Sequence, residues 1–295
     1  MQWSRREERA ATVDPVMNPA FADEHLKSMR EAAPYECPKI SGVESLKLLS
    51  FNIQVGIKTS AYRQYLTKGW KHVLPHQARG RNLSKIANVI SDYDLVALQE
   101  VDGGSIRSGF VNQVEFLSHN AGFPYWYAQT NRDLGPIARH GNGVLSRIAP
   151  RELEDHKLPG RIPGRGAVFL RIPYASDELV VVMLHLSLGR QSRERQLAYI
   201  AEQVAHERQV IIMGDMNTHM SQLLESSPLK HLALQPADQG RITPTYPAWE
   251  PSYALDHVLV SANLQVRDYR VLNCRVSDHL PIAVEIAARE LPALQ

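Results

Sequence analysis

Two oxygen-bearing side chains, Asp215 and Asn217, directly follow a short apolar run, Val210-Ile-Ile-Met213, in this chain of 295 residues. Such a run, ended here by Gly214, is typical of a buried strand, and strand periodicity turns residues two apart to the same side. A carboxylate can hold a water and an amide can hold a phosphoryl oxygen, which would begin a hydrolytic reaction. The same residues also fit an ordinary turn in which Asp and Asn bond to nearby backbone.

Polar side chains stand at the ends of several other apolar runs. They are Asn52, Glu100, His185, Asp256, Asp278 and His279. Each alone has a structural explanation, such as an amide bonded to backbone, a paired carboxylate or a structural histidine. Their recurrence at strand ends instead predicts one shared edge. The set is rich in oxygen and has no thiolate, so it suits Mg²⁺ or Mn²⁺ better than a closed zinc site.

The elements that must position these groups alternate between strands and helices. Strands are expected over residues 46–55, 94–100, 125–129, 143–147, 167–172, 179–185, 210–214, 255–261, 266–272 and 277–286. Apolar residues at helical spacing predict helices over residues 83–92, 111–121 and 193–206. The sequence shows neither an internal repeat nor a low-complexity tract.

The composition is that of a globular protein, with 44% hydrophobic, 22% charged and 7% aromatic residues. A formal net charge of +2 gives no field that favours nucleic acid as a partner. The two cysteines, Cys37 and Cys274, form neither a disulfide framework nor a metal-binding cluster, which favours a reducing compartment. We expect a cytoplasmic monomer, because residues 1–10 lead into no apolar leader and no stretch is long enough to span a membrane.

We divide the chain into an extension at residues 1–44, a catalytic domain at 45–289 and a tail at 290–295. Scattered charges and prolines mark the extension, where one helix is expected near residues 23–32. A long connection at residues 56–81 interleaves basic residues with tyrosine and tryptophan. This connection would suit phosphates beside a base, a sugar or a lipid, or it is simply a solvated loop.

Seven segments resemble, in order, the successive motifs of the endonuclease/exonuclease/phosphatase superfamily. They are Leu49-Ser-Phe-Asn-Ile53, Leu98-Gln-Glu-Val-Asp102, Gly141-Asn-Gly-Val-Leu-Ser-Arg147, Leu184-His-Leu186, Met213-Gly-Asp-Met-Asn217, Leu255-Asp-His257 and Ser277-Asp-His-Leu-Pro281, within residues 46–287. The resemblance implies a four-layer α/β sandwich, in which two mixed β-sheets pack face to face with helices on both outer faces. It also implies a metal site at one rim of the sheets.

The positions within these motifs imply how a metal and an anion would be held. Glu100 would be the main ligand of Mg²⁺, or of Mn²⁺, with Asn52 nearby and Asp278 as a further ligand or a second-site carboxylate. Arg107 and Arg165 are candidate substrate contacts, although either could be an ordinary surface arginine.

The resemblance also implies catalytic roles. Asp215 would orient or deprotonate the attacking water, and Asn217 would hold that water or a phosphate oxygen. His279, oriented by Asp256, would contact the phosphate and stabilise the charge that develops there. His185 would act from the opposite side, as a phosphate ligand or by helping the leaving group.

The leading functional hypothesis is a divalent-metal-dependent phosphoester hydrolase, either a phosphodiesterase or a phosphatase, with a small or lipid-type phosphodiester as the favoured substrate. Residues 98–102 resemble the sphingomyelinase-like and deadenylase-like branches more than abasic-site endonucleases, and the small net charge argues against duplex DNA. A nuclease for single-stranded DNA or RNA is the alternative, which the basic connection would suit. A non-catalytic binding module is a third hypothesis, but such a protein would be expected to lack a metal- or water-handling residue.

Overall fold

The computed structural model describes residues 45–56, 77–160, 164–175 and 177–288. The predicted extension, its helix and the tail at 290–295 lie outside these residues, as does most of the basic connection at 56–81. The division into extension, domain and tail therefore stays a prediction. No helix in the described part combines the length and the apolar character that are needed to cross a bilayer.

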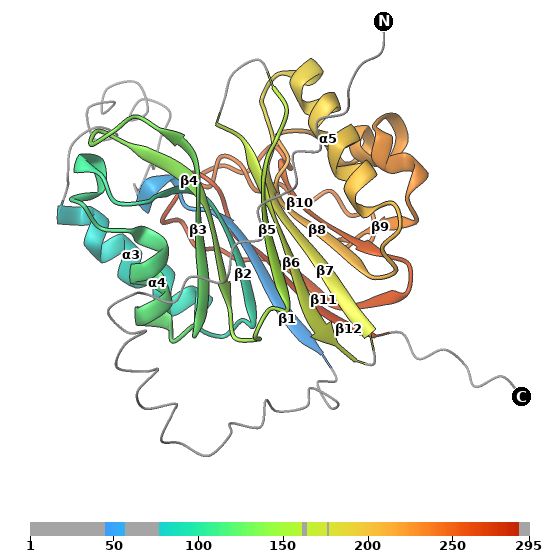
Figure 1. Cartoon of the computed structure of the whole chain (residues 1–295), viewed down its shortest axis with the longest axis horizontal. Coiled ribbons are helices and arrows are strands. Elements are labelled where there is room, and N and C mark those ends of the chain that lie inside the picture. Colours follow the sequence, from blue (N-terminus) through green and yellow to red (C-terminus); the bar gives the residue numbers. More distant parts are fainter. Residues whose placement is uncertain (1–44, 57–76, 161–163, 176, 289–295) are drawn as a thin grey trace, which may run out of the picture.

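Two six-stranded β-sheets form the centre of the protein (Figure 1). The first sheet contains β1 (Leu46–Asn52), β2 (Leu95–Asp102), β3 (Tyr125–Asp133), β4 (Arg139–Ser146), β11 (Leu264–Val271) and β12 (Ile282–Ala288). The second contains β5 (Glu152–Lys157), β6 (Gly166–Tyr174), β7 (Asp177–His185), β8 (Val210–Asp215), β9 (Leu234–Pro236) and β10 (Asp256–Ser261).

Both sheets are mixed. The first has the order β11-β12-β1-β2-β4-β3 and the second the order β5-β6-β7-β8-β10-β9. A parallel pair, β1 with β2 or β7 with β8, lies at the middle of each sheet, and every other neighbouring pair is antiparallel. Parallel neighbours need a long crossover, which a helix supplies in each case.

Helices cover the outer face of each sheet (Figure 1). The longer ones are α3 (Gln77–Ile90), α4 (Gln113–Ala121) and α5 (Arg190–Val204). Shorter helical turns are η1 (Gln54–Gly56), η3 (Ile106–Ser108), η4 (Gln222–Ser226) and η5 (Pro228–His231). Apolar residues of α3 and α4 pack on the first sheet, and those of α5 pack on the second. The predicted four-layer α/β sandwich is confirmed.

The inner core lies between the two sheets, and the strands are apolar on both faces. In β1, Leu46 and Leu48 belong to this inner core, whereas Leu49 and Phe51 pack toward the helices. Because both faces are covered, such strands read as continuous apolar runs in the sequence. The last expected strand begins later than predicted, at Ile282, because residues 277–281 form a loop that carries two of the candidate site residues.

Gly214 lies where β7 and β8 approach closely, immediately before Asp215. Its φ is +146°, and a Cβ at this position would overlap the backbone oxygen of Leu184. Gly214→Ala is therefore expected to lower the free energy of unfolding by about 3 kcal/mol or more, as measured by denaturant titration. Gly80→Ala is the control, because no atom would lie within 4 Å of its Cβ. A Gly214→Ala variant as stable as the wild type would contradict the close approach.

Candidate active site

The middle strands of both sheets carry polar side chains to one rim of the sandwich. Asn52 ends β1, His185 ends β7 and Asp215 ends β8. Asp256 is the first residue of β10. Since β10 runs antiparallel to β8, Asp256 pairs with Asp215, the last residue of β8. The loop before β12 adds His279. The structure thus brings together residues from both halves of the chain, and all of those named here are buried.

Asp215 is the centre of this group. Its Oδ2 accepts a hydrogen bond from Asn52 Nδ2 at 3.0 Å and lies 3.3 Å from His185 Nε2 and 3.9 Å from His279 Nε2. Its Oδ1 accepts from the backbone N–H of Asn217 at 3.0 Å. Burial raises the pKa of Asp215 to about 7, although the charge on His279 and the Asn52 hydrogen bond oppose the shift. A carboxylate with such a pKa can take up a proton near neutral pH.

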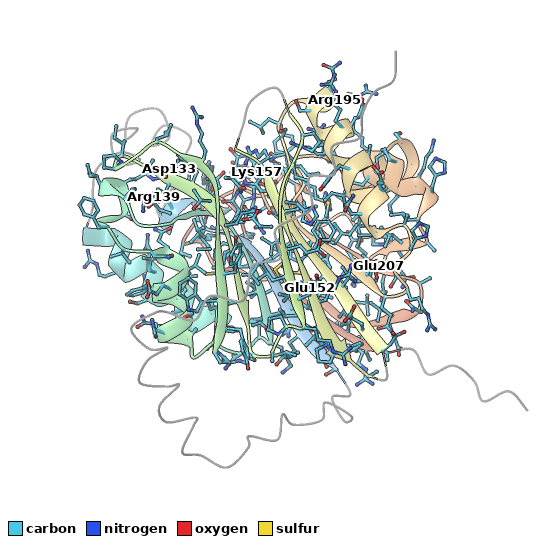
Figure 2. All side chains as sticks on the ribbon, in the orientation of Figure 1. Asp133, Arg139, Glu152, Lys157, Arg195 and Glu207 are labelled. Carbon is cyan, nitrogen blue, oxygen red and sulfur yellow. The ribbon has the colours of Figure 1, made fainter. Side chains whose placement is uncertain are left out.

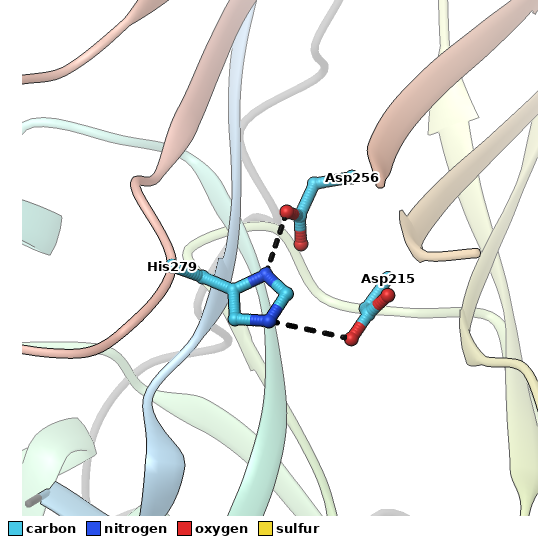
Figure 3. Close-up of side chains that lie close together, drawn as sticks. All are labelled: Asp215, Asp256 and His279. Carbon is cyan, nitrogen blue, oxygen red and sulfur yellow. Dashed lines mark hydrogen bonds and ion pairs between the residues drawn. The ribbon is translucent and has the colours of Figure 1, made fainter. Parts of the chain in front are cut away.

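His279 is oriented by Asp256 (Figure 3). The Nδ1 atom of the imidazole lies 2.7 Å from Asp256 Oδ2, and the Thr245 hydroxyl donates to the same oxygen at 2.6 Å. Burial opposes protonation of His279, but the charges on Asp256 and Asp215 outweigh it and raise its pKa well above 6.5. A cationic imidazole is therefore fixed beside Asp215. Nothing in the sequence pattern indicated Thr245.

Asp215, Asp256 and His279 also have the spacing of metal ligands, since their candidate ligand atoms lie within 4.8 Å of one another (Figure 3). However, the Asp256 oxygen that faces His279 is already an acceptor for the imidazole and for the Thr245 hydroxyl. This geometry is that of a carboxylate that orients an imidazole.

An irregularity in β2 sets the direction of the Glu100 side chain. The pairing of β2 with β4 shifts register between Gln99 and Val101, and Glu100 has a φ of 55°. A bulge of this kind redirects a side chain that regular alternation would place elsewhere. The Glu100 side chain lines a cavity of about 490 Å³ at the rim.

Several acidic groups lie close together in this region. A bound cation would reduce the repulsion between their negative charges. Burial raises the pKa of Asp278 to about 6, and the charge of Glu100 adds to the shift. Glu100 acts in the same direction on Asp215. Asn52 Oδ1 accepts from the backbone N–H of Gln54 at 3.1 Å, and a carbonyl oxygen has a second lone pair. Carboxylate and amide oxygens of this kind fit Mg²⁺ or Mn²⁺.

His185 is held between Asp215 and Arg165. Arg165 Nη1 lies 2.7 Å from His185 Nδ1 and 2.6 Å from His185 Nε2, and Nε2 also faces Asp215. Burial lowers the pKa of His185 well below 6.5, and the charge on Arg165 adds to the effect. The imidazole is therefore neutral near neutral pH, and it lies between a guanidinium group and a carboxyl group.

Arg107, which the sequence offered as a substrate contact, is engaged inside the fold. Its guanidinium forms a buried ion pair with Asp102 at 2.9 Å, and its Nη1 lies 3.2 Å from the His140 ring nitrogens. The serines of the same loop, Ser105 and Ser108, donate to Asp102 as well. Arg107 therefore stabilises the loop after β2, and we do not count it among the substrate contacts.

Other residues that line the cavity were not singled out in the sequence. They include Asn131, Arg132, His140, Asn142, Ser187 and Ser192. Asn142 lies inside a recognised motif and His140 directly precedes that motif, which could have drawn attention to both. Arg132 could not have been found in this way, because only the pairing of β3 with β4 brings it to the rim.

A family model described as the Endonuclease/Exonuclease/phosphatase family matches residues 49–279 of the chain. The chain belongs to the endonuclease/exonuclease/phosphatase family. Enzymes of this family hydrolyse phosphoester bonds, and its members use divalent metals. The resemblance seen in the sequence is thus confirmed at the level of the superfamily.

Three similar proteins illustrate the range of the endonuclease/exonuclease/phosphatase family. The uncharacterised protein YbhP of Escherichia coli strain K12 is 30% identical over 267 residues, which cover 82% of this chain and 96% of YbhP. A family member from Beutenbergia cavernae has a TM-score of 0.66 at 18% identity, over 85% of this chain and 73% of that one. The mannosyl-6-phosphatase Bt3783 of Bacteroides thetaiotaomicron has a TM-score of 0.60 at 17% identity, over 82% and 99%. At these identities the two solved structures show the shared fold.

Proposed function

We propose that the chain is a Mg²⁺-dependent phosphoester hydrolase, a phosphodiesterase or a phosphatase, in which Mn²⁺ can replace Mg²⁺. The observation that carries the proposal is the position of Asp215, which lies among Asn52, His185 and His279 at the rim that carries Glu100. Held by Glu100, with Asn52 and Asp278 as further oxygen donors, the cation would neutralise the charge that develops on the phosphoryl group.

The residues of the chain supply the remaining steps. Asp215 orients the attacking water and takes its proton as the bond from water to phosphorus forms and the bond to the leaving oxygen breaks. The cationic His279 stabilises the negative charge on the phosphoryl oxygens. His185 binds a phosphate oxygen from the other side. Asn217 bonds to the backbone oxygen of Leu186 through Nδ2 at 3.0 Å, and its amide oxygen can position the water.

For the substrate, we propose a small or lipid-type phosphodiester. Large apolar side chains are exposed in the loops beside the rim: Phe110 is 70% exposed and Leu188, which lines the cavity, is 75% exposed. An acyl chain or another apolar group would cover such surface. The sphingomyelinase-like or deadenylase-like branch is proposed on residues 98–102 alone. The cytoplasmic location and the monomeric state expected from the sequence stay predictions.

Single-stranded nucleic acid is the second candidate substrate. The observation that favours it is the presence of Arg132 and Arg165 in the cavity, because arginine suits the phosphates of a nucleic-acid backbone. A panel of phospholipid, inositol phosphate, RNA and DNA substrates distinguishes the two candidates.

The enzymatic claim is tested with bis-p-nitrophenyl phosphate in the presence of Mg²⁺ or Mn²⁺. We expect turnover that a chelator abolishes and that either cation restores. Asp238→Asn is the control for loss of a buried carboxylate, since Asp238 follows β9 and does not line the cavity. Turnover no greater than that of an Asp215→Ala variant, across both metals and all substrates of the panel, would leave the non-catalytic binding module as the remaining hypothesis.

His279→Ala is expected to lower kcat by about 10²-fold, because a cation that faces the phosphoryl group is lost. The dissociation constant for Mg²⁺, measured by calorimetry, should stay within about twofold of the wild-type value, since His279 is not a proposed ligand. His156→Ala is the control, because His156 is also buried but bonds to Tyr199 and Glu154 under α5. Equal losses of rate and of metal affinity would make His279 a metal ligand.

A further inference from the structure

Two arginine side chains line the cavity without a carboxylate partner among the residues that the structure describes. Arg132 lies in β3 and is exposed, and Arg165 precedes β6 and contacts His185. Other arginines near the rim are paired: Arg107 with Asp102, and Arg139 with Asp133 at 3.7 Å. The cavity therefore contains positive charge that no carboxylate in this part of the chain pairs with.

Gly164 brings the two arginines together. Its φ is +121°, and a Cβ at this position would lie 3.5 Å from Arg132 Cβ and 3.6 Å from Arg132 Cδ. The stem of Arg132 thus runs along the backbone immediately before Arg165. Arg132 and Arg165 thus come from adjoining parts of the chain, and both line the cavity together with Glu100.

The positive charge of the cavity side chains is not neutralised by its acidic residue, which favours binding of an anion. Glu100 is the acidic residue among those that line it in the described structure, and the proposed function assigns its charge to the cation. Burial lowers the pKa of Arg165, which shows that its guanidinium is partly removed from water, although Glu100 and Asp215 oppose the shift. A desolvated cation without a carboxylate partner is costly, and a guanidinium group can form paired hydrogen bonds to phosphate oxygens.

We propose that Arg132 and Arg165 bind a second phosphate group of the substrate, next to the phosphate that is hydrolysed. The inference rests on the proposed function, which uses Asp215, His185 and His279 for the scissile phosphate. A cavity of about 490 Å³ has the size of a site for a small organic ligand. The second phosphate belongs either to a lipid headgroup or to a nucleic-acid chain.

Calorimetry with two matched pairs of ligands in the presence of Mg²⁺ tests the inference. One pair is adenosine 5′-phosphate and adenosine 3′,5′-bisphosphate, and the other is inositol 1-phosphate and inositol 1,4-bisphosphate. We expect the bisphosphate of at least one pair to bind about tenfold more tightly than its monophosphate. Preference within the nucleotide pair identifies a nucleic-acid source, and preference within the inositol pair identifies a headgroup.

Substitutions assign the preference to the arginines. Arg132→Ala is expected to reduce the ratio of bisphosphate to monophosphate affinity from about tenfold to about twofold, and Arg132→Lys to restore part of it. Arg139→Ala is the matched control and should keep the full ratio, since Arg139 lies in the same hairpin beside Asp133 and outside the cavity (Figure 2). Both substituted residues are exposed, so neither variant should unfold.

Two results would overturn the inference: no preference for a bisphosphate in either pair, or a preference that survives Arg132→Ala. Turnover of bis-p-nitrophenyl phosphate by the wild type is measured in parallel, and it does not depend on a second phosphate because this compound has only one. If turnover is present and the preference is absent, the second phosphate site fails and the proposed function stands. If turnover is absent, the proposed function fails.

Discussion

Asp215→Asn is expected to lower kcat for bis-p-nitrophenyl phosphate by about 10³-fold, because an amide keeps the shape of the side chain but cannot take the proton of the water. Asp238→Asn makes the same change in a buried carboxylate away from the cavity and should leave kcat within about twofold of the wild type. An Asp215→Asn variant that retained a tenth of the activity would show that another group removes the proton.

The same substitution is expected to change the pH dependence of stability in metal-free protein. The pKa of Asp215 is raised from 3.8 to about 7 in the folded state by burial, so the folded protein binds the proton more tightly than the unfolded chain does. The stability that this proton contributes is present below pH 3.8 and is lost as the pH rises to about 7. Denaturant titrations across this range should show that the wild type loses stability relative to Asp215→Asn.

Glu100→Ala is expected to weaken Mg²⁺ binding and to lower activity together, each by about 10²-fold. The reason is that the substitution removes the carboxylate that the bulge in β2 directs into the cavity. Calorimetry with Mg²⁺ and Mn²⁺ measures the first effect, and turnover at saturating metal measures how much activity the ion restores. Glu202→Ala, on the exposed surface of α5, is the control for loss of a negative charge.

If the Glu100→Ala variant bound Mg²⁺ with unchanged affinity, the cation would have to bind at a site that does not include Glu100. The alternative site is the cluster of Asp215, Asp256 and His279, whose ligand atoms already lie close together. In that case His279→Ala would lower the metal affinity instead. The two variants therefore decide between the two candidate metal positions with one measurement.

The strand ends could be predicted because burial on both faces makes each central strand an unbroken apolar run. Asn52, His185 and Asp215 are polar residues at the ends of such runs, and each ends a strand in the structure. β5 (Glu152–Lys157) was missed because it is a charged strand at the edge of its sheet and lacks this pattern. The three-residue β9 was too short to leave a pattern.

Contacts within the site depend on tertiary pairing that the sequence does not encode locally. The hydrogen bond from Thr245 to Asp256 joins residues of a loop and a strand, and no spacing rule links them. The sequence offered Arg107 as a substrate contact because its ion pair with Asp102 is visible only in the folded loop. The orientation of Glu100 depends on a bulge, which a single sequence does not reveal.

The two sheets match each other in the order and direction of their strands. Strand by strand, β11-β12-β1-β2-β4-β3 and β5-β6-β7-β8-β10-β9 run in matching directions, and a helix joins the middle pair in each. The two sheets therefore share one arrangement of strand directions, although no repeat is visible in the sequence.

Because the strand arrangements match, residues at the rim occupy equivalent positions in the two sheets. In the first sheet Asn52 stands beside Gln99, which pairs with Asn142. In the second sheet His185 stands beside Asp215, which pairs with Asp256. One half offers amides where the other offers an imidazole and two carboxylates. The amide half can thus hydrogen-bond to the titrating half, as Asn52 does to Asp215, without adding charge at its own equivalent positions.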